Sequence, residues 1–283
     1  MKTQIISAAV ALLINSSSAL QDDSIYGANG ISGPAPCLKE YAIDNSGPAT
    51  GEDQHFVHGF ESKDGAGVTA GSGFELRAGG KGRVALAIKQ GQWRTQLGAK
   101  ELTAEANWGA ESPDGSYVII GGFLENAAKS TDMVLWKLDS KTGKVLWEMT
   151  YQDAKKAGDA VESVAFAPDG GLIVGGFVAG GAKASELKFK SAGQPEEGTP
   201  FVGKISAADV NGAKAPTKFE WTFTKNDDTQ IKNEENQYRG STKSMRIAQD
   251  GTIYALSGYR TTVNKLDQKG NLIKCSGQLD FAF

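Results

Sequence analysis

The chain has 283 residues, with 30 basic and 33 acidic side chains and a formal net charge of −3. The charges are spread without blocks, and this argues against nucleic acid or an anionic membrane as a partner, since both need a concentrated basic face. Thirty-six glycines beside eight prolines indicate many tight turns, and regular hydrophobic runs between them exclude a disordered chain. The length suits one large all-β domain.

Residues 1–19 are predicted to be a secretory signal peptide. Lys2 precedes an apolar run at 5–14, and Ser17 and Ala19 are the small residues before a cleavage site. The alternative is a membrane anchor, but the run is shorter than the about 20 residues that a spanning helix needs. No later segment is long and apolar enough to span. We therefore expect a secreted protein without an integral membrane segment, extracellular or, in a bacterium, periplasmic.

Residues 20–54 are rich in Gly, Pro, Ser, Asp and Asn, and they predict an irregular N-terminal extension. From residue 55 onward one phrase occurs four times: an Asp-Gly pair, a β-rich run, a small residue with Gly, and an aromatic. The copies start at Asp64, Asp114, Asp169 and Asp250 and end at Phe74, Phe123, Phe177 and Tyr259. All-strand repeats of about 40 to 50 residues are typical of propeller blades. We expect an all-β fold over residues 55–283, a small β-propeller with about four four-stranded blades.

The third unit shows the strand pattern most clearly. Period-two alternation predicts strands at 162–167, 172–177, 201–205 and 219–223, with a turn at 168–171. Inserts at 180–199 and 225–240 then lengthen the period. Long inserts on a rigid scaffold are candidate binding segments, and solvated loops are the alternative. In the second insert we select as candidate binding residues four acids, which could also gather calcium or form a charged surface: Asp227, Asp228, Glu234 and Glu235.

Residues 134–148 read Val-Leu-Trp-Lys-Leu-Asp-Ser-Lys-Thr-Gly-Lys-Val-Leu-Trp-Glu. This segment resembles the repeat of quinoprotein-like β-propellers, in which a strand ends in Leu-Asp, a Thr-Gly turn follows, and the next strand closes with Trp. The third and fourth units also resemble the bacterial-type β-propeller repeat. The resemblance implies that Trp93, Trp147 and Trp221 pack between blades. Quinone-dependent dehydrogenases of that family are much larger and bind their cofactor with a calcium ion and adjacent cysteines. This chain has neither that length nor adjacent cysteines, so we expect no cofactor.

Two cysteines are present, Cys37 and Cys275. In an oxidising compartment a lone pair usually joins, so we predict a disulfide between the N-terminal extension and the last repeat, with two free thiols as the alternative. The only histidines, His55 and His58, are three residues apart, and regular strand alternation would place them on opposite faces. We therefore expect no metal site there.

Trp108, Tyr259 and Arg260 complete the candidate binding residues. Trp108 follows Asn107 and suits either a rim or a core position, while Tyr259 and Arg260 form an aromatic and cationic pair suited to recognition, with blade packing as the alternative.

No nucleophile elbow, catalytic triad or ordered carboxylate pair is present. We expect a non-catalytic secreted binding or scaffold propeller for a protein or glycan, oligomeric if four blades do not close a ring. The alternative is a small carbohydrate-active hydrolase or lyase with carboxylates at the channel mouth.

Overall fold

The computed structural model describes residues 55–77, 80–98, 103–125, 130–152, 158–180, 199–224, 241–257 and 262–275. The expected signal peptide, N-terminal extension and Cys37 lie outside these ranges. Most of the two inserts and six candidate binding residues lie outside them as well: Asp227, Asp228, Glu234, Glu235, Tyr259 and Arg260. Among the described residues, no helix reaches the length and apolarity that crossing a membrane requires.

The described residues form four antiparallel sheets of four strands each, in which neighbouring strands follow one another along the chain. The first blade contains β1 (His55–Glu61), β2 (Gly67–Arg77), β3 (Gly80–Lys89) and β4 (Trp93–Leu97). The second contains β5 (Ala104–Glu111), β6 (Tyr117–Glu125), β7 (Thr131–Asp139) and β8 (Val145–Tyr151). The third contains β9 (Gly158–Phe166), β10 (Leu172–Gly180), β11 (Thr199–Ile205) and β12 (Trp221–Thr224), with the short helix α2 (Ala207–Asn211) between its last two strands. The fourth contains β13 (Thr242–Ile247), β14 (Ile253–Ser257), β15 (Thr262–Leu266) and β16 (Leu272–Cys275).

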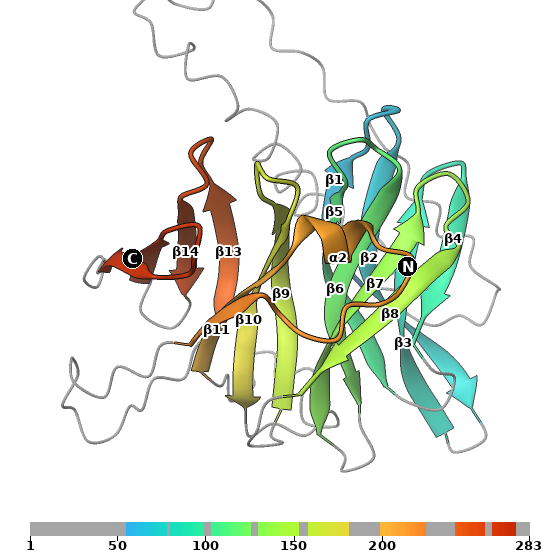
Figure 1. The fold of residues 1–283 in the computed structure, drawn as a ribbon. Coiled ribbons are helices and arrows are strands. Elements are labelled where there is room, and N and C mark those ends of the chain that lie inside the picture. Colours follow the sequence, from blue (N-terminus) through green and yellow to red (C-terminus); the bar gives the residue numbers. More distant parts are fainter. Residues whose placement is uncertain are drawn as a thin grey trace, which may run out of the picture.

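Each Asp-Gly pair forms the turn between the first and second strands of its blade, as the repeat predicted. The glycines have φ angles of +76° to +82°, a conformation that a residue with a side chain rarely adopts. Each aspartate accepts a hydrogen bond from the backbone N–H two residues further on, at 2.9 to 3.1 Å. These four turns lie along the upper edge of the molecule in Figure 1. The dipeptide therefore sets both the turn conformation and its internal hydrogen bond.

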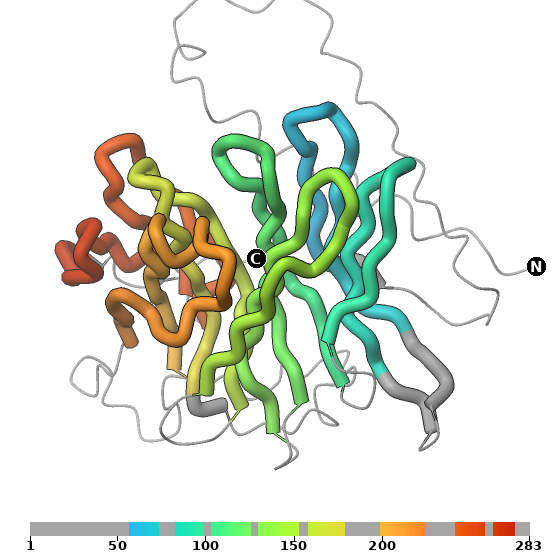
Figure 2. The backbone as a smooth tube through the Cα atoms, turned by 45° about the vertical axis from the view of Figure 1, so that its right-hand side comes forward, coloured from blue at the N-terminus to red at the C-terminus, as the bar shows by residue number. Residues whose placement is uncertain are grey.

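Successive blades pack through the first strand of the later blade. β5 packs against β1, β2 and β3; β9 packs against β5, β6 and β7; and β13 packs against β9, β10 and β11. The blades follow one another in chain order, with the first and the last at opposite ends of the row in both views (Figures 1 and 2). The protein is thus an all-β, small β-propeller with four blades, and the described blades form an arc.

The core lies between the blades rather than within any one of them. One cluster joins the first and second blades through residues such as Ala87 and Trp136, and the largest joins the second and third through residues such as Leu135 and Phe201. Phe123 and Phe177, two of the repeated aromatics, are buried together with Ala160. Apolar burial between neighbouring sheets is therefore the main force that holds the arc together.

The first strand of every blade carries a β-bulge, at Val57, Asn107, Glu162 and Lys243. The bulge at Val57 breaks the regular strand alternation on which the prediction about the two histidines was based. In the backbone register, His55 lies opposite Ser72 and His58 lies opposite Ala70. The extra residue shifts the alternation by one position, which the sequence pattern did not indicate.

Candidate functional site

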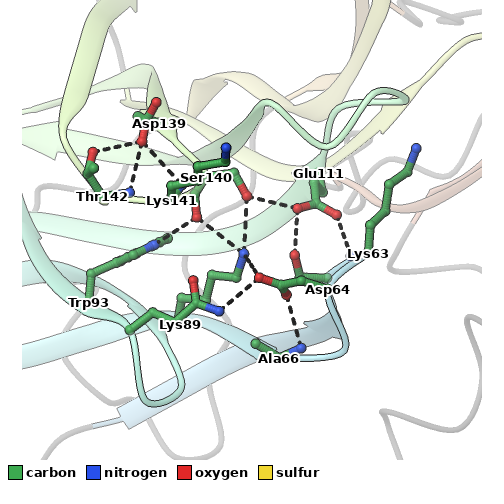
Figure 3. A network of polar contacts seen from close by, with 12 residues as sticks. Lys63, Asp64, Ala66, Lys89, Trp93, Glu111, Asp139, Ser140, Lys141 and Thr142 are labelled. Atoms are coloured by element: carbon green, nitrogen blue, oxygen red, sulfur yellow. Dashed lines mark hydrogen bonds and ion pairs between the residues drawn. The ribbon is translucent and has the colours of Figure 1, made fainter.

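Successive blades contact each other near their Asp-Gly turns. We call each such contact region a seam and name it by the numbers of its two blades. The 1/2 seam is filled by hydrogen bonds to one carboxylate (Figure 3). Glu111 of the second blade accepts hydrogen bonds from Ser62 Oγ at 2.5 Å and from the Lys63 backbone N–H at 2.7 Å, both of the first blade. It also accepts one from Ser140 Oγ at 2.9 Å. Every oxygen of this carboxylate is used to join two blades.

Lys89 of β3 also connects the two blades at the 1/2 seam. Its ammonium group donates to the backbone oxygen and to Oγ of Ser140, each at 3.2 Å, and pairs with Asp64 Oδ2 at 2.8 Å (Figure 3). Lys89 is only 2% exposed. Hydrogen bonds from Gln92 and Lys89 hold the pKa of Asp64 well below its usual range. The buried cation is thus compensated, as a stable buried charge requires.

The 2/3 seam is filled by aromatic rings around another lysine. The Lys137 ammonium lies 4.1 Å from the ring centre of Tyr117 and donates to the Val210 backbone oxygen at 2.9 Å. Tyr117 donates its hydroxyl to Asn211 Oδ1 at 2.9 Å and meets Phe166 edge to face at 5.9 Å. Burial lowers the pKa of Lys137 and, together with Asp114, raises that of Tyr117 to about 12. The residues of α2 therefore help to close this seam.

The 3/4 seam has the same backbone positions but different side chains. Counted from the Asp-Gly turns, Ala167 stands where the 1/2 seam has Ser62, Pro168 stands for Lys63, and Ile247 stands for Glu111. A hydroxyl, a backbone N–H and a carboxylate are lost together, because proline has no N–H. The third-strand lysine is kept as Lys204, and Gln268 takes the place of Ser140.

A cavity of about 280 Å³ lies at the 3/4 seam. It is lined by Ala167, Pro168, Asp169, Ile173, Lys204, Gly251, Ile253 and Gln268. Ile173 and Ile253 are each 1% exposed and give the cavity an apolar wall, whereas Pro168 and Gln268 are exposed at its mouth. The cavity is therefore amphipathic and open to solvent where the two Asp-Gly turns meet.

The polar residues that line the cavity form an ion pair. Lys204 Nζ lies 2.5 Å from Asp169 Oδ2 and 3.8 Å from Glu220 Oε2, and the lysine is 7% exposed. The hydrogen bond from Lys204 lowers the pKa of Asp169, so that this carboxylate is ionised at neutral pH. Both carboxylates are about half exposed and can accept further hydrogen bonds from a ligand.

Two of the repeated tryptophans join neighbouring blades, as the family resemblance implied. Trp93 donates its indole N–H to the Ser140 backbone oxygen, and Trp221 donates to that of Gln268, both at 3.0 Å. A Cβ added to Gly143 or Gly270 would collide with these rings, so each indole lies flat on a glycine turn of the next blade. Trp221 thereby positions the backbone of Gln268 beside the cavity.

Trp147 occupies the equivalent strand position in the second blade, but α2 stands where a glycine turn would receive it. In the backbone register, a third-strand lysine lies opposite a fourth-strand tryptophan in three blades: Lys89 and Trp93, Lys137 and Trp147, Lys204 and Trp221. In the fourth blade, Lys265 lies opposite Lys274. Trp147 is 5% exposed, packs in the largest core cluster and leaves its indole N–H without a hydrogen-bond partner.

Of the candidate binding residues, Trp108 is the one that the structure describes. It lies on β5, is partly buried against the largest core cluster, and stacks on His58 with ring centres 3.8 Å apart. His58 Nδ1 accepts a hydrogen bond from the Gly109 backbone N–H at 3.2 Å. Trp108 therefore has a packing role between the first two blades, and the structure does not bring it to the 3/4 cavity.

Cys275 ends β16, while its predicted partner Cys37 lies outside the described residues, so the predicted disulfide stays a prediction. Among the described residues, no three His, Cys, Asp or Glu side chains gather in a way that could hold a metal ion.

No family model matches the sequence, and no curated protein matches it. Among solved structures, the chain is similar to the quinohemoprotein alcohol dehydrogenase ADHIIG of Pseudomonas putida HK5, with 12% identity, a TM-score of 0.42 and coverage of 74% of this chain. It spans only 34% of that enzyme.

The chain is also similar to the β-propeller domain of Cps50 (Swd1) from Myceliophteria thermophila, with 10% identity, a TM-score of 0.43, and coverage of 78% of this chain and 72% of that one. A third similar structure is the periplasmic gluconolactonase PpgL of Pseudomonas aeruginosa, with 14% identity, a TM-score of 0.34, and coverage of 76% and 70%. At these scores the similarities carry no argument about activity. The propeller assignment rests on the four sheets and their packing.

Proposed function

We propose that the protein is a secreted, non-catalytic binding propeller that engages a protein or glycan partner through the 3/4 seam. The observation that supports this proposal is the contrast among the three seams. One is filled by a hydrogen-bonded carboxylate and one by aromatic rings, whereas the third leaves an amphipathic cavity with a solvent-facing mouth. A concave site with an apolar wall and a few polar groups is the usual form of a binding site.

The inserts at 180–199 and 225–240, most of which lie outside the described residues, are the second candidate binding region. The strands that flank them stop at Gly180, Thr199, Thr224 and Thr242. In an antiparallel meander these strand ends lie at the opposite edge of the blade from the Asp-Gly turns. Changes at the inserts and changes at the 3/4 seam are therefore separable by experiment.

The charge states of the turn carboxylates favour binding over the hydrolase or lyase alternative. Hydrogen bonds from Ser112 and Ser116 hold the pKa of Asp114 at about 2. The pKa values of the other three are also lowered, by Gln92 and Lys89 at Asp64, by Lys204 at Asp169 and by the Thr252 backbone N–H at Asp250. A glycosidase needs one carboxylic acid with a raised pKa to protonate the leaving group. These aspartates instead remain ionised and stabilise their own turns.

The test begins with expression of the full chain in a secreting host. N-terminal sequencing of the exported protein should give a start at Leu20. The mature protein is then screened on a glycan array, in a pull-down from a secreted-protein fraction, and for turnover of polysaccharides. Specific binding without turnover is the expected result. Turnover that disappears when one acidic residue is replaced, in a variant that still folds, would contradict the proposal.

A further inference from the structure

We propose that the cavity at the 3/4 seam binds one sugar ring of a glycan, an inference that rests on the proposed binding function and names its ligand class. Size is the first argument. At about 280 Å³ the cavity lies just below the roughly 300 to 1,000 Å³ of pockets for drug-sized ligands. It is far larger than the share of about 30 Å³ that one water molecule takes. A single-ring ligand matches this volume.

The distribution of polar and apolar groups is the second argument. Ile173 and Ile253 supply apolar surface, whereas Lys204, the cross-strand neighbour of Ile173, supplies N–H donors and Asp169 supplies a carboxylate acceptor. A pyranose likewise combines apolar and polar groups. Its C–H groups form an apolar face, and the hydroxyls around the ring both donate and accept hydrogen bonds. Gln268 adds an amide at the mouth of the cavity.

The charge balance selects a neutral ligand over an ionic one. Asp169 already pairs with Lys204, and Glu220 lies 3.8 Å from the same ammonium. An anionic ligand would have to approach two carboxylates, and a cationic ligand would have to compete with a lysine that is already in place. A neutral polyol hydrogen-bonds to the existing pair without desolvating another charge.

The substitutions at this seam explain why the space is open. At the 1/2 seam, Ser62 and the Lys63 N–H fill the equivalent space through Glu111. Ala167 and Pro168 offer neither of these donors. Trp221 binds the Gln268 backbone oxygen, and the Gln268 side-chain amide donates to the Asp250 backbone oxygen, so the residues at the mouth are held in place.

The direct test titrates the mature protein with the methyl glycosides of glucose, galactose, mannose and N-acetylglucosamine. Backbone amide chemical shifts are followed by NMR. We expect at least one sugar to shift the amides of Gly251 and Gly170, at the 3/4 seam, and to leave those of Gly65 and Gly115 unchanged. The latter two glycines occupy the same turns at the other blades. Shifts spread equally over all four turns, or no shift with any of the sugars, would overturn the inference.

Variants then locate the site. Ala167→Leu places a larger apolar side chain in the cavity and should weaken sugar binding at least 10-fold. Ala208→Leu makes the same change on the exposed side of α2 and should leave binding unchanged. If A167L fails to fold, Gln268→Ala at the exposed mouth replaces it, with an expected loss of several-fold. Sugar binding that A167L or Q268A leaves intact refutes the assignment to this cavity.

These outcomes separate the sugar site from the broader function. A protein partner that binds the wild type and A167L equally, with no sugar bound, excludes the sugar site and the role of the 3/4 seam but is consistent with a binding function. Turnover of a polysaccharide removes the binding function itself.

Discussion

Gly143 tests the contact between the first two blades, because Gly91 provides a matched control. Both glycines have nearly the same left-handed backbone, with φ of +68° and +69°. A Cβ at Gly143 would lie 2.6 Å from Cδ2 of Trp93 and 2.7 Å from Oγ1 of Thr95, whereas a Cβ at Gly91 would meet nothing within 4 Å. The substitution to alanine therefore adds the same backbone strain at both sites and a collision at only one.

The expected losses of stability follow from the backbone strain at both sites and the collision at Gly143. Left-handed backbone costs an alanine about 1 to 2 kcal/mol at either position. At Gly143 the Trp93 ring must also move, which breaks its 3.0 Å hydrogen bond to Ser140. Overpacking of this kind costs about 1 to 3 kcal/mol, and a lost hydrogen bond about 1 kcal/mol. We expect Gly143→Ala to lower the free energy of unfolding by ~2 to 4 kcal/mol more than Gly91→Ala does.

The assay is equilibrium unfolding in urea, monitored by tryptophan fluorescence and by far-ultraviolet circular dichroism. Equal m-values for the two variants would show that the same folded structure is lost. Equal losses of stability in the two variants would refute the reasoning, because Trp93 would then contribute no contact at Gly143. A second comparison, Trp93→Phe, should abolish most of the difference between the two glycine substitutions.

Three other predictions address the histidine, the seam carboxylate and the cysteines. Burial lowers the pKa of His58 from 6.5 to about 4, so the unfolded chain binds the extra proton first. Stability contributed by neutral His58 is present above pH 6.5 and is lost as the pH falls towards 4, by up to about 3 kcal/mol. Urea titrations from pH 7.5 to 4 should show this loss in the wild type and not in His58→Gln, and identical slopes would contradict it. Glu111→Ala should cost ~2 to 4 kcal/mol because the donors of Ser62 and its neighbours lose their acceptor, and a change of less than ~0.5 kcal/mol would show that the network contributes little. A disulfide between Cys37 and Cys275 should stabilise the mature chain by about 4 to 5 kcal/mol, and two reactive thiols in the unfolded, non-reduced protein would exclude it.

The Asp-Gly turns illustrate what the sequence is able to predict. An aspartate that bonds to its own turn, followed by a glycine with positive φ, is a local device, and its four copies mark the four blades. The strands predicted at 172–177 and 201–205 lie within β10 and β11 for a related reason. Alternating apolar residues need only a neighbouring sheet to become buried.

The 3/4 cavity shows what local patterns leave out. Ala167 and Pro168 are ordinary turn residues, and nothing about them alone indicates a site. Their meaning comes from comparison with Ser62 and Lys63 at the same position of another blade, and from Glu111, which reaches that position from the next blade. A residue-by-residue alignment of the four units could have found this substitution, whereas a search for catalytic motifs could not.

The first and fourth described blades differ from the others in the tryptophan and glycine-turn contact that joins neighbouring blades. The fourth blade has Lys274 where the other three blades have a tryptophan, so it presents no indole to a following blade. The first blade connects β3 to β4 through a tight turn around Gly91, and no ring lies against that glycine. Terminal units of repeat proteins commonly depart from the repeat in this way, because they have a neighbour on one side only. A head-to-tail contact between two copies would therefore lack the tryptophan that the first three described blades have at this position.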